Sequence, residues 1–240
     1  MTRFSEAYFF MIEPKAASVF FILLGALSGW AQESPRSSEQ ELSDRGRNVN
    51  QCLTPPYCSD AKRNHAGELI NMDYYVAKQD SETTHLLHLV EVAHTNRVLP
   101  QISKNDYGGA LIDIKYTLNR FPNHPLGLIL IGLYARLSKS YGVPVPYYEK
   151  AIRLFPQHAL THAQYGAYMI TLGNIDAGMK KLHQALEMNP ELVFAHVWLA
   201  AVYFKIGNVE LGRHSEIKAR DLGYKGKISI ETLQNTQTGK

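Results

Sequence analysis

Three prolines that recur at a fixed interval constrain the fold of this chain more than any other feature. They are Pro122, Pro156 and Pro190, each 34 positions after the one before. A column of small residues keeps the same step, five positions before each proline and once beyond the last: Thr117, Ala151, Ala185 and Ala219. Self-similarity at a fixed period of this size indicates stacked supersecondary units. One such unit cannot bury its apolar face alone, so neighbouring units stack and form a curved surface that commonly binds a partner.

The residues between the prolines predict paired helices. Helices are expected from Asp106 to about Arg120 and near residues 125–139, 144–155, 158–172, 175–188, 192–206 and 208–222. Gly173 and Gly207, which are separated by the same repeat step, mark turns within two of the units. Antiparallel helices approach closely only where small residues meet. The residues expected at these crossings are Gly132, Gly166 and Ala200 on first helices, and Ala110, Pro144, Gly178 and Gly212 on second helices.

These columns resemble the tetratricopeptide repeat family over roughly residues 106–224, because the small, aliphatic, alanine and proline positions agree in register. The resemblance implies an all-α fold, a right-handed α-solenoid of about 3.5 helix-turn-helix repeats. Two departures are His162 and His196, which stand at the family's tryptophan-type position. Glu216 and Tyr224 in the last unit predict a polar C-terminal cap. The segment DIKYTLNRFPNH (113–124) is also similar to one in exported bacterial repeat proteins of unknown function, which implies no activity.

The first unit lacks a plausible first helix. His94, Arg97 and Gln101 occupy its core positions, and Pro100 interrupts it. The sequence therefore predicts an irregular N-terminal segment over residues 51–105, ahead of the repeats over 106–224 and a flexible tail over 225–240. Polar residues 32–50 are expected to form a flexible linker.

The N-terminus predicts export. Residues 16–31 contain no Lys, Arg, Asp or Glu. They end in Gly29, Trp30 and Ala31, and the small residues Gly29 and Ala31 suit a signal peptidase that cleaves between Ala31 and Gln32. A helix of this length spans about 24 Å, less than the roughly 30 Å hydrocarbon core of a membrane. A cleaved signal peptide over residues 1–31, with a periplasmic or secreted product, is therefore favoured over an N-terminal membrane anchor. Translation from Met11 would give a more usual leader than translation from Met1.

Cys52 and Cys58 are the cysteines of the chain. In an oxidising compartment an isolated pair predicts a disulfide, and Pro55-Pro56 between them provides the turn that the bridge needs. A metal site made of Cys52, Cys58 and His65 matches no common zinc spacing.

Charge and motifs favour neither nucleic-acid binding nor catalysis. The net charge of +3, from 25 basic and 22 acidic residues, is small and scattered. The chain has no GxSxG motif, no phosphate-binding glycine loop and no conspicuous nucleophile-base pair. The histidine pairs His85/His88 and His158/His162 lack the acidic neighbours of a metal site. We expect no enzyme activity, no cofactor and no metal.

The family's concave face is formed by the first helices, and the resemblance places an apolar groove there. The family's lysine-asparagine carboxylate clamp is missing. The groove residues expected from the resemblance are Leu126, Ile129, Leu133, Arg136, Leu160, Ala163, Ala167, Ile170, Phe194, Val197, Ala201 and Phe204. Either residues 51–105 cover this groove or a partner binds in it.

The sequence thus predicts a non-catalytic scaffold in the cell envelope that binds a protein or peptide, with assembly of an envelope or secretion complex as the setting suggested by analogy. The alternative is a ligand- or metal-binding protein with its site in the Cys52–His94 segment and the repeats as support.

Overall fold

The protein is mostly helical in a computed structural model that describes residues 62–63, 65 and 69–228. A short antiparallel pair of strands, β1 (Lys62–Arg63) and β2 (Leu69–Ile70), precedes the helices. The helices follow in the order α3 (Tyr74–Ala77), α4 (Ser81–Ala93), the 3-10 helix η2 (Thr95–Arg97), α5 (Val98–Ser103), α6 (Tyr107–Arg120), α7 (Pro125–Leu137), α8 (Val145–Leu154), α9 (Ala159–Thr171), α10 (Ile175–Met188), α11 (Val193–Lys205) and α12 (Val209–Asp221). The predicted all-α class is confirmed.

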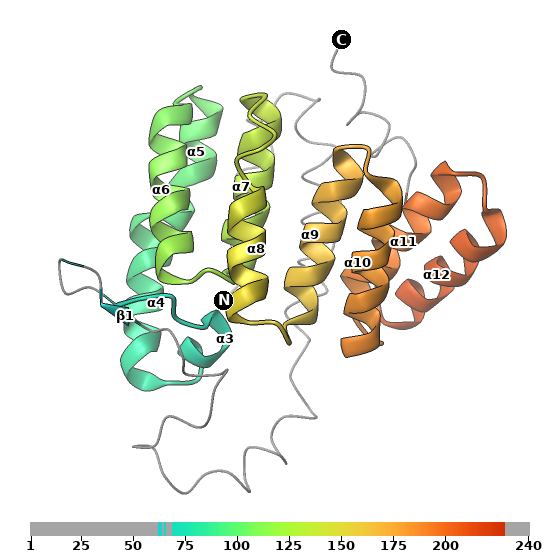
Figure 1. Ribbon diagram of the computed structural model, residues 1–240, viewed down its shortest axis with the longest axis horizontal. Coiled ribbons are helices and arrows are strands. Elements are labelled where there is room, and N and C mark those ends of the chain that lie inside the picture. Colours follow the sequence, from blue (N-terminus) through green and yellow to red (C-terminus); the bar gives the residue numbers. More distant parts are fainter. Residues whose placement is uncertain (1–61, 64, 66–68, 229–240) are drawn as a thin grey trace, which may run out of the picture.

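From α7 onward the helices repeat at the step of the prolines. Helices α7, α9 and α11 are each 13 residues long. Their first residues, Pro125, Ala159 and Val193, are 34 positions apart. Figure 1 shows α9 beside α10 and α11 beside α12, with the helices following one another across the molecule. The helices from α6 onward lie within two residues of the bounds expected from the sequence.

The turns have the backbone geometry that their residues predict. Gly173 and Gly207 adopt φ of +89° and +82°, the left-handed region that glycine enters without steric cost. They follow α9 and α11 and turn the chain into α10 and α12. Between the pairs, Pro122 and Pro156 directly follow the residues that cap α6 and α8, where proline prevents the helix from continuing.

Glycines bring α9 and α10 together until their backbones touch. A Cβ on Gly166 would lie 2.7 Å from the carbonyl oxygen of Gly178, and one on Gly178 would lie 2.6 Å from the carbonyl oxygen of Gly166. No side chain larger than hydrogen fits between the two helices at this point. The predicted crossing of these helices is therefore present.

Aromatic rings occupy the space at two other expected crossings. A Cβ on Gly132 would meet the ring of Tyr168 at 3.4 Å and the hydroxyl of Tyr148 at 3.6 Å. A Cβ on Gly212 would lie 2.6 Å from the ring of Phe204. These glycines make room for a neighbouring aromatic side chain, and they do not bring two backbones into contact.

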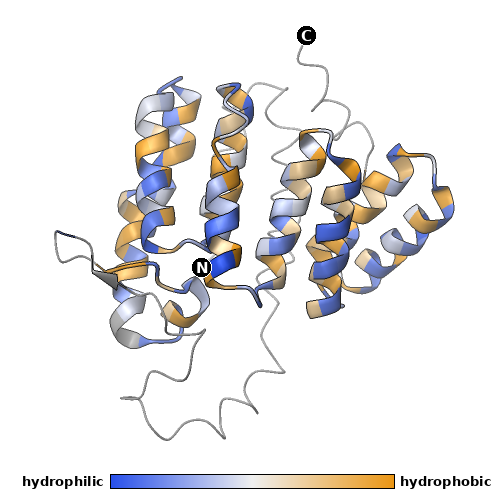
Figure 2. Cartoon of the chain, in the orientation of Figure 1, coloured by the Kyte–Doolittle hydropathy of each residue, from blue (hydrophilic) through white to orange (hydrophobic). Residues whose placement is uncertain are grey.

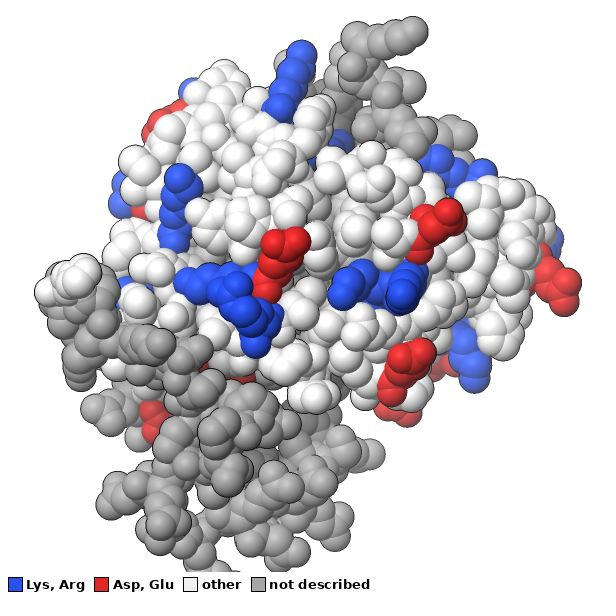
Figure 3. Space-filling view, in the orientation of Figure 1, with Lys and Arg blue, Asp and Glu red and all other residues white. Residues whose placement is uncertain are grey.

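Burial differs between the two members of a pair. Helices α7 and α11 are buried around most of their circumference, whereas α12 buries only its small residues Gly212, Ser215 and Ala219. In Figure 2 blue hydrophilic residues alternate with orange ones along α10 and α12. In the face shown in Figure 3, on which α8 and α10 lie, charged side chains of both signs are interspersed. This is the composition of a helix face that contacts water.

The N-terminal segment differs from the irregular structure predicted over residues 51–105, because its described part from Tyr74 onward is mostly helical. Pro100 does not prevent α5, since it is the third residue of that helix. The first-turn N–H groups of a helix have no carbonyl partner within it, so a proline there removes no hydrogen bond. Helix α5 packs against α6 and supplies the first helix that was not expected from the sequence.

A buried carboxylate explains the polar residues around this helix. Asp113 of α6 accepts hydrogen bonds from His94 Nδ1 at 2.7 Å and from Gln101 Nε2 at 2.8 Å. The Nε of Arg97 lies 3.7 Å from the same carboxylate. One partner on α6 thus accounts for the polarity of His94, Arg97 and Gln101. From the sequence alone these polar residues count as evidence against a first helix, but here they stabilise the pair of α5 and α6.

Candidate functional site

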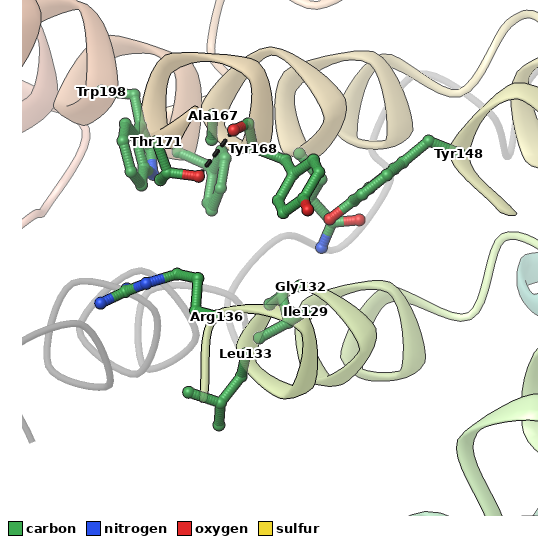
Figure 4. Close-up of a pocket in the computed structure, with 11 residues that line it drawn as sticks. Ile129, Gly132, Leu133, Arg136, Tyr148, Ala167, Tyr168, Thr171 and Trp198 are labelled. Carbon is green, nitrogen blue, oxygen red and sulfur yellow. Dashed lines mark hydrogen bonds between the residues drawn. The ribbon is translucent and has the colours of Figure 1, made fainter. Parts of the chain in front are cut away.

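The candidate site is a pocket formed by the helices α7, α9 and α11, with one residue from α8. Its lining residues are Ile129, Gly132, Leu133, Arg136, Tyr148, Gln164, Ala167, Tyr168, Thr171, Phe194 and Trp198. In Figure 4, Arg136 extends from α7 on the side of Thr171 and Trp198, while the Leu133 side chain points away from α9. The cavity has a volume of about 40 Å³, measured as the space that the centre of a water molecule can reach. That is room for about three waters, or for the end of one side chain.

Two tyrosines form one wall of this pocket. The ring of Tyr148 stacks on the ring of Tyr168 with centroids 5.7 Å apart. The Tyr148 hydroxyl donates to the Leu128 carbonyl at 2.9 Å, and the Tyr168 hydroxyl donates to the Tyr141 carbonyl at 2.5 Å. Burial raises the pKa of Tyr148, and burial together with Tyr141 raises the pKa of Tyr168 to about 12. Both hydroxyls stay protonated at neutral pH and hold the wall in place.

Arg136 is the charged residue of the pocket lining. Burial lowers the pKa of its guanidinium, and the neighbouring Tyr141 and Tyr168 partly oppose that effect. Arginine nevertheless remains a cation in proteins. Among the described residues no carboxylate lies within ion-pair distance of Arg136, and its buried Nη1 has no hydrogen-bond partner. A partly buried cation without a counter-charge is costly, so this group favours an anionic or strongly accepting ligand.

Two further buried polar atoms in the pocket have no partner within the described chain. They are Nε1 of Trp198, a donor, and Oε1 of Gln164, an acceptor. The side-chain amide of Gln164 is oriented by its Nε2, which donates to the Pro125 carbonyl at 3.0 Å. Gln164 and Trp198 stand one repeat step apart, at the same position of successive units. Most buried polar atoms in proteins are paired, so the three unpaired groups mark this pocket as incomplete.

The structure divides the twelve predicted groove residues into three sets. Ile129, Leu133, Arg136, Ala167 and Phe194 line the pocket. Five others are buried among the helices: Leu160, Ala163, Ile170, Val197 and Ala201. Leu126 and Phe204 are half-buried, Leu126 against the core around α6 and α7, and Phe204 against Gly212 of α12. Five of the twelve positions, contributed by α7, α9 and α11, therefore line the pocket, whereas the other seven face the core or a neighbouring helix.

Sequence reasoning missed six lining residues: Gly132, Tyr148, Gln164, Tyr168, Thr171 and Trp198. From the sequence, Gly132 is assigned to a crossing between helices and not to a binding site. The column that contains Gln164 and Trp198 offered a signal, because two residues capable of hydrogen bonding replace Leu130 at the same step. A polar group in a column that is otherwise apolar indicates either a buried hydrogen bond or a ligand.

The N-terminal segment docks on the turns between the helix pairs. The Asp73 carboxylate pairs with His158 Nε2 at 2.7 Å and accepts from Asn123 Nδ2 at 3.1 Å. The rings of Tyr74 and Tyr75 contact those of His124 and His158, with centroids 4.7 and 4.6 Å apart. His124 and His158 are equivalent turn residues, 34 positions apart. No pocket-lining residue comes from the described residues 69–105, so this part of the segment does not line the pocket.

The contacts of Asp73 determine its ionisation. Burial raises the pKa of Asp73, but the hydrogen bond and charge of His158 and the hydrogen bonds from Asn123 and the Tyr75 N–H outweigh it. The net effect is a pKa below the ordinary value. The carboxylate therefore contributes stability above its unfolded-state pKa, and this contribution is lost as the pH falls through the lower folded-state value.

Several histidines of the described chain have structural partners. His162 Nε2 pairs with the Pro156 carbonyl at 2.9 Å, and His196 Nε2 pairs with the Pro190 carbonyl at 2.8 Å. His124 Nδ1 accepts from the Gly127 N–H at 3.1 Å and so caps α7. Within the described ranges, no group of three histidine, cysteine or acidic residues could hold a metal ion.

Several sequence predictions lie outside the described residues. They are the signal peptide over 1–31, the linker over 32–50, the Cys52–Cys58 disulfide and the tail beyond residue 228. No helix among the described residues is both long and apolar enough to cross a membrane. The alternative site in the Cys52–His94 segment falls partly outside the described chain, and nothing in the remainder favours it.

Comparison with known proteins adds no family to this description. No protein-family model matches the chain, and no curated protein matches it. The assignment to a repeat family therefore depends on the residues of this chain alone.

Proposed function

We propose that the chain is a tetratricopeptide-type α-solenoid that binds a segment of another protein in the pocket formed by α7, α9 and α11. With α5 as the first helix of the first unit, the described residues contain four helix pairs, from α5–α6 to α11–α12, in place of the about 3.5 repeats expected from the sequence. The repeat assignment is supported by helices that begin at the step of the prolines and by the left-handed glycines at equivalent turns. The equivalent bonds from His162 and His196 to proline carbonyls support it further.

The single observation that carries the binding function is the apolar pocket with three unpaired polar groups. Pockets that bind ligands are mostly apolar and contain a few polar groups that fix orientation. Here those groups are Arg136, Gln164 and Trp198, which come from three different first helices. A partner that spans the three helices satisfies all of them at once. This arrangement offers binding groups and no nucleophile-base pair, so the proposed role is non-catalytic.

The setting that we propose is the cell envelope. It follows from the uncharged segment over residues 16–31 and its small residues before Gln32. A scaffold role in assembling an envelope or secretion complex rests on analogy with other exported repeat proteins.

Site-specific photo-crosslinking in the cell envelope tests the binding function. A photoreactive residue at Thr171, which lines the pocket, is compared with one at Arg153, which is exposed on α8 and lies outside it. We expect a discrete crosslinked product from position 171 and none from position 153. The same products from both positions, or none from position 171, would overturn the proposal.

Ile170 is one of the groove residues expected from the sequence, but its substitution would be a poor test of binding. Its side chain is 1% exposed and packs where α9 meets Gly178, so a glutamate there would unfold the helix pair. Arg136→Gln is the better perturbation, because it removes the charge and retains a polar amide on a shorter side chain. Arg153→Gln makes the same change at an exposed position and serves as the matched control.

A further inference from the structure

We infer that the pocket binds an acidic side chain within an internal peptide segment, flanked by apolar residues. This inference rests on the proposed function and names the chemistry of the partner. It follows from the charge of Arg136, from the unpaired polar atoms and from the size of the pocket.

The charge of Arg136 calls for a carboxylate. Its guanidinium is partly buried, and one of its nitrogens is buried without an acceptor. No acidic residue of the described chain lies within 4 Å of it. The planar guanidinium matches a carboxylate through two parallel hydrogen bonds, and such charge-assisted bonds are about twice as strong as neutral ones. A partner carboxylate therefore supplies the counter-charge that the described chain lacks.

The other two unpaired atoms suit a peptide. Trp198 Nε1 offers a donor to a backbone carbonyl, and Gln164 Oε1 offers an acceptor to a backbone N–H. A peptide backbone carries both groups at every residue other than proline. Sulfate and an ionised fatty acid have no donor for Gln164, and hydrogen phosphate offers an O–H but no apolar part to contact the rest of the lining.

The size and lining of the pocket argue for a side chain that enters from a longer segment. The free space accommodates about three waters, which is close to the volume of a carboxyl end and too small for a whole ligand. The apolar residues Ile129, Ala167 and Phe194 border this space. Apolar residues on either side of the acidic one would be partly buried against them.

A displayed library of random dodecapeptides tests the inference. The peptides are fused through their C-termini, so every carboxylate selected for binding is a side chain. We expect wild-type protein to enrich sequences with Asp or Glu next to apolar residues. The enrichment is expected to be lost on Arg136→Gln and kept on Arg153→Gln.

Binding of one selected peptide is then measured by fluorescence of Trp198 in a Trp30→Phe background, where Trp198 is the remaining tryptophan. Replacing the peptide's acidic residue with its amide is expected to weaken binding about 10- to 100-fold. Arg136→Gln should produce a similar loss, and combining the two changes should add little. Thermal unfolding of Arg136→Gln at or above the wild-type temperature shows that the loss is local, because removing a cation without a counter-charge does not destabilise the fold.

The outcomes separate the two levels of the proposal. Selected peptides without acidic enrichment overturn the acidic specificity and leave peptide binding in place. A requirement for a free C-terminus, seen with synthetic peptides of matched sequence, also overturns the inference. Failure to select any peptide that changes the fluorescence of Trp198 contradicts the proposed function itself.

Discussion

The pair α5–α6 and the pair α9–α10 occupy corresponding places in the repeat register but are held together by different chemistry. In the second pair Gly166 and Gly178 bring two backbones into contact. Two repeat steps earlier stand Val98 and Ala110, both fully buried. Their side chains require more space than hydrogen does, and the polar network centred on Asp113 joins these helices.

This difference shows that the register specifies where helices meet, while the residues at the crossing specify how. Glycine contact is non-directional and depends only on the absence of side chains. The network around Asp113 depends on the identity and geometry of each donor, because a buried carboxylate must be paired. The first pair is thus the more sensitive to the exchange of polar residues, and the later pair is the more sensitive to added volume.

The substitution with the largest expected effect tests the contact between Gly166 and Gly178. Gly166→Leu places a branched side chain where even a Cβ would lie 2.7 Å from a backbone oxygen. Helices α9 and α10 must separate, and we expect the free energy of unfolding to fall by more than about 3 kcal/mol in urea denaturation.

Gly142→Leu is the matched control, because nothing lies within 4 Å of a Cβ at Gly142. Its effect should stay within about 0.5 kcal/mol. Equal effects of the two substitutions would show that the backbone contact does not hold the pair together.

The second prediction addresses the polar pair. Asp113→Ala removes the acceptor of His94 and Gln101 and leaves their donors without a partner on α6. We expect a loss of about 2–3 kcal/mol in the free energy of unfolding. Asp176→Ala, at an exposed position in the first turn of α10, should cost no more than about 1 kcal/mol. The network is not needed if the two variants unfold at the same urea concentration.

The substitution with the smallest expected effect replaces one residue of the α5–α6 pair with the residue at the same position of the next unit. Thr117 stands one repeat step before Ala151, and its hydroxyl bonds to the Thr95 hydroxyl at 3.0 Å and to the Asp113 carbonyl at 3.1 Å. Thr117→Ala should cost about 1 kcal/mol.

The Thr95→Ala/Thr117→Ala double variant should cost less than the sum of the single variants, because the two hydroxyls share one bond. Strict additivity would exclude that coupling. Thermal unfolding of the four proteins in parallel measures it.

Much of the helical fold could be predicted because the repeat signal is carried by backbone-determining residues. Glycines with positive φ and prolines after a helix act locally, so Gly173, Gly207 and Pro156 give the same structure wherever the chain places them. The N-terminal helix α5 could not be predicted in this way. The polar residues around it are explained only by Asp113, which lies on another helix.

The site was predicted in part for a related reason. Periodicity identified the helices α7, α9 and α11, but the rotation of each helix toward the pocket depends on its neighbours. Ile170 stands at the repeat position of Arg136, yet it is buried against Gly178 while Arg136 lines the pocket. Equivalent repeat positions therefore do not share one environment when the residues that surround them differ.

The bonds from His162 to Pro156 and from His196 to Pro190 have a consequence for how such a chain lengthens or shortens. Each histidine reaches back six residues, from the first turn of one helix to the turn that precedes it. Insertion or deletion of a few residues in that turn separates donor from acceptor. Insertion of a complete repeat unit preserves every such bond. Evolution and engineering alike can therefore change the length of this molecule most readily in whole units.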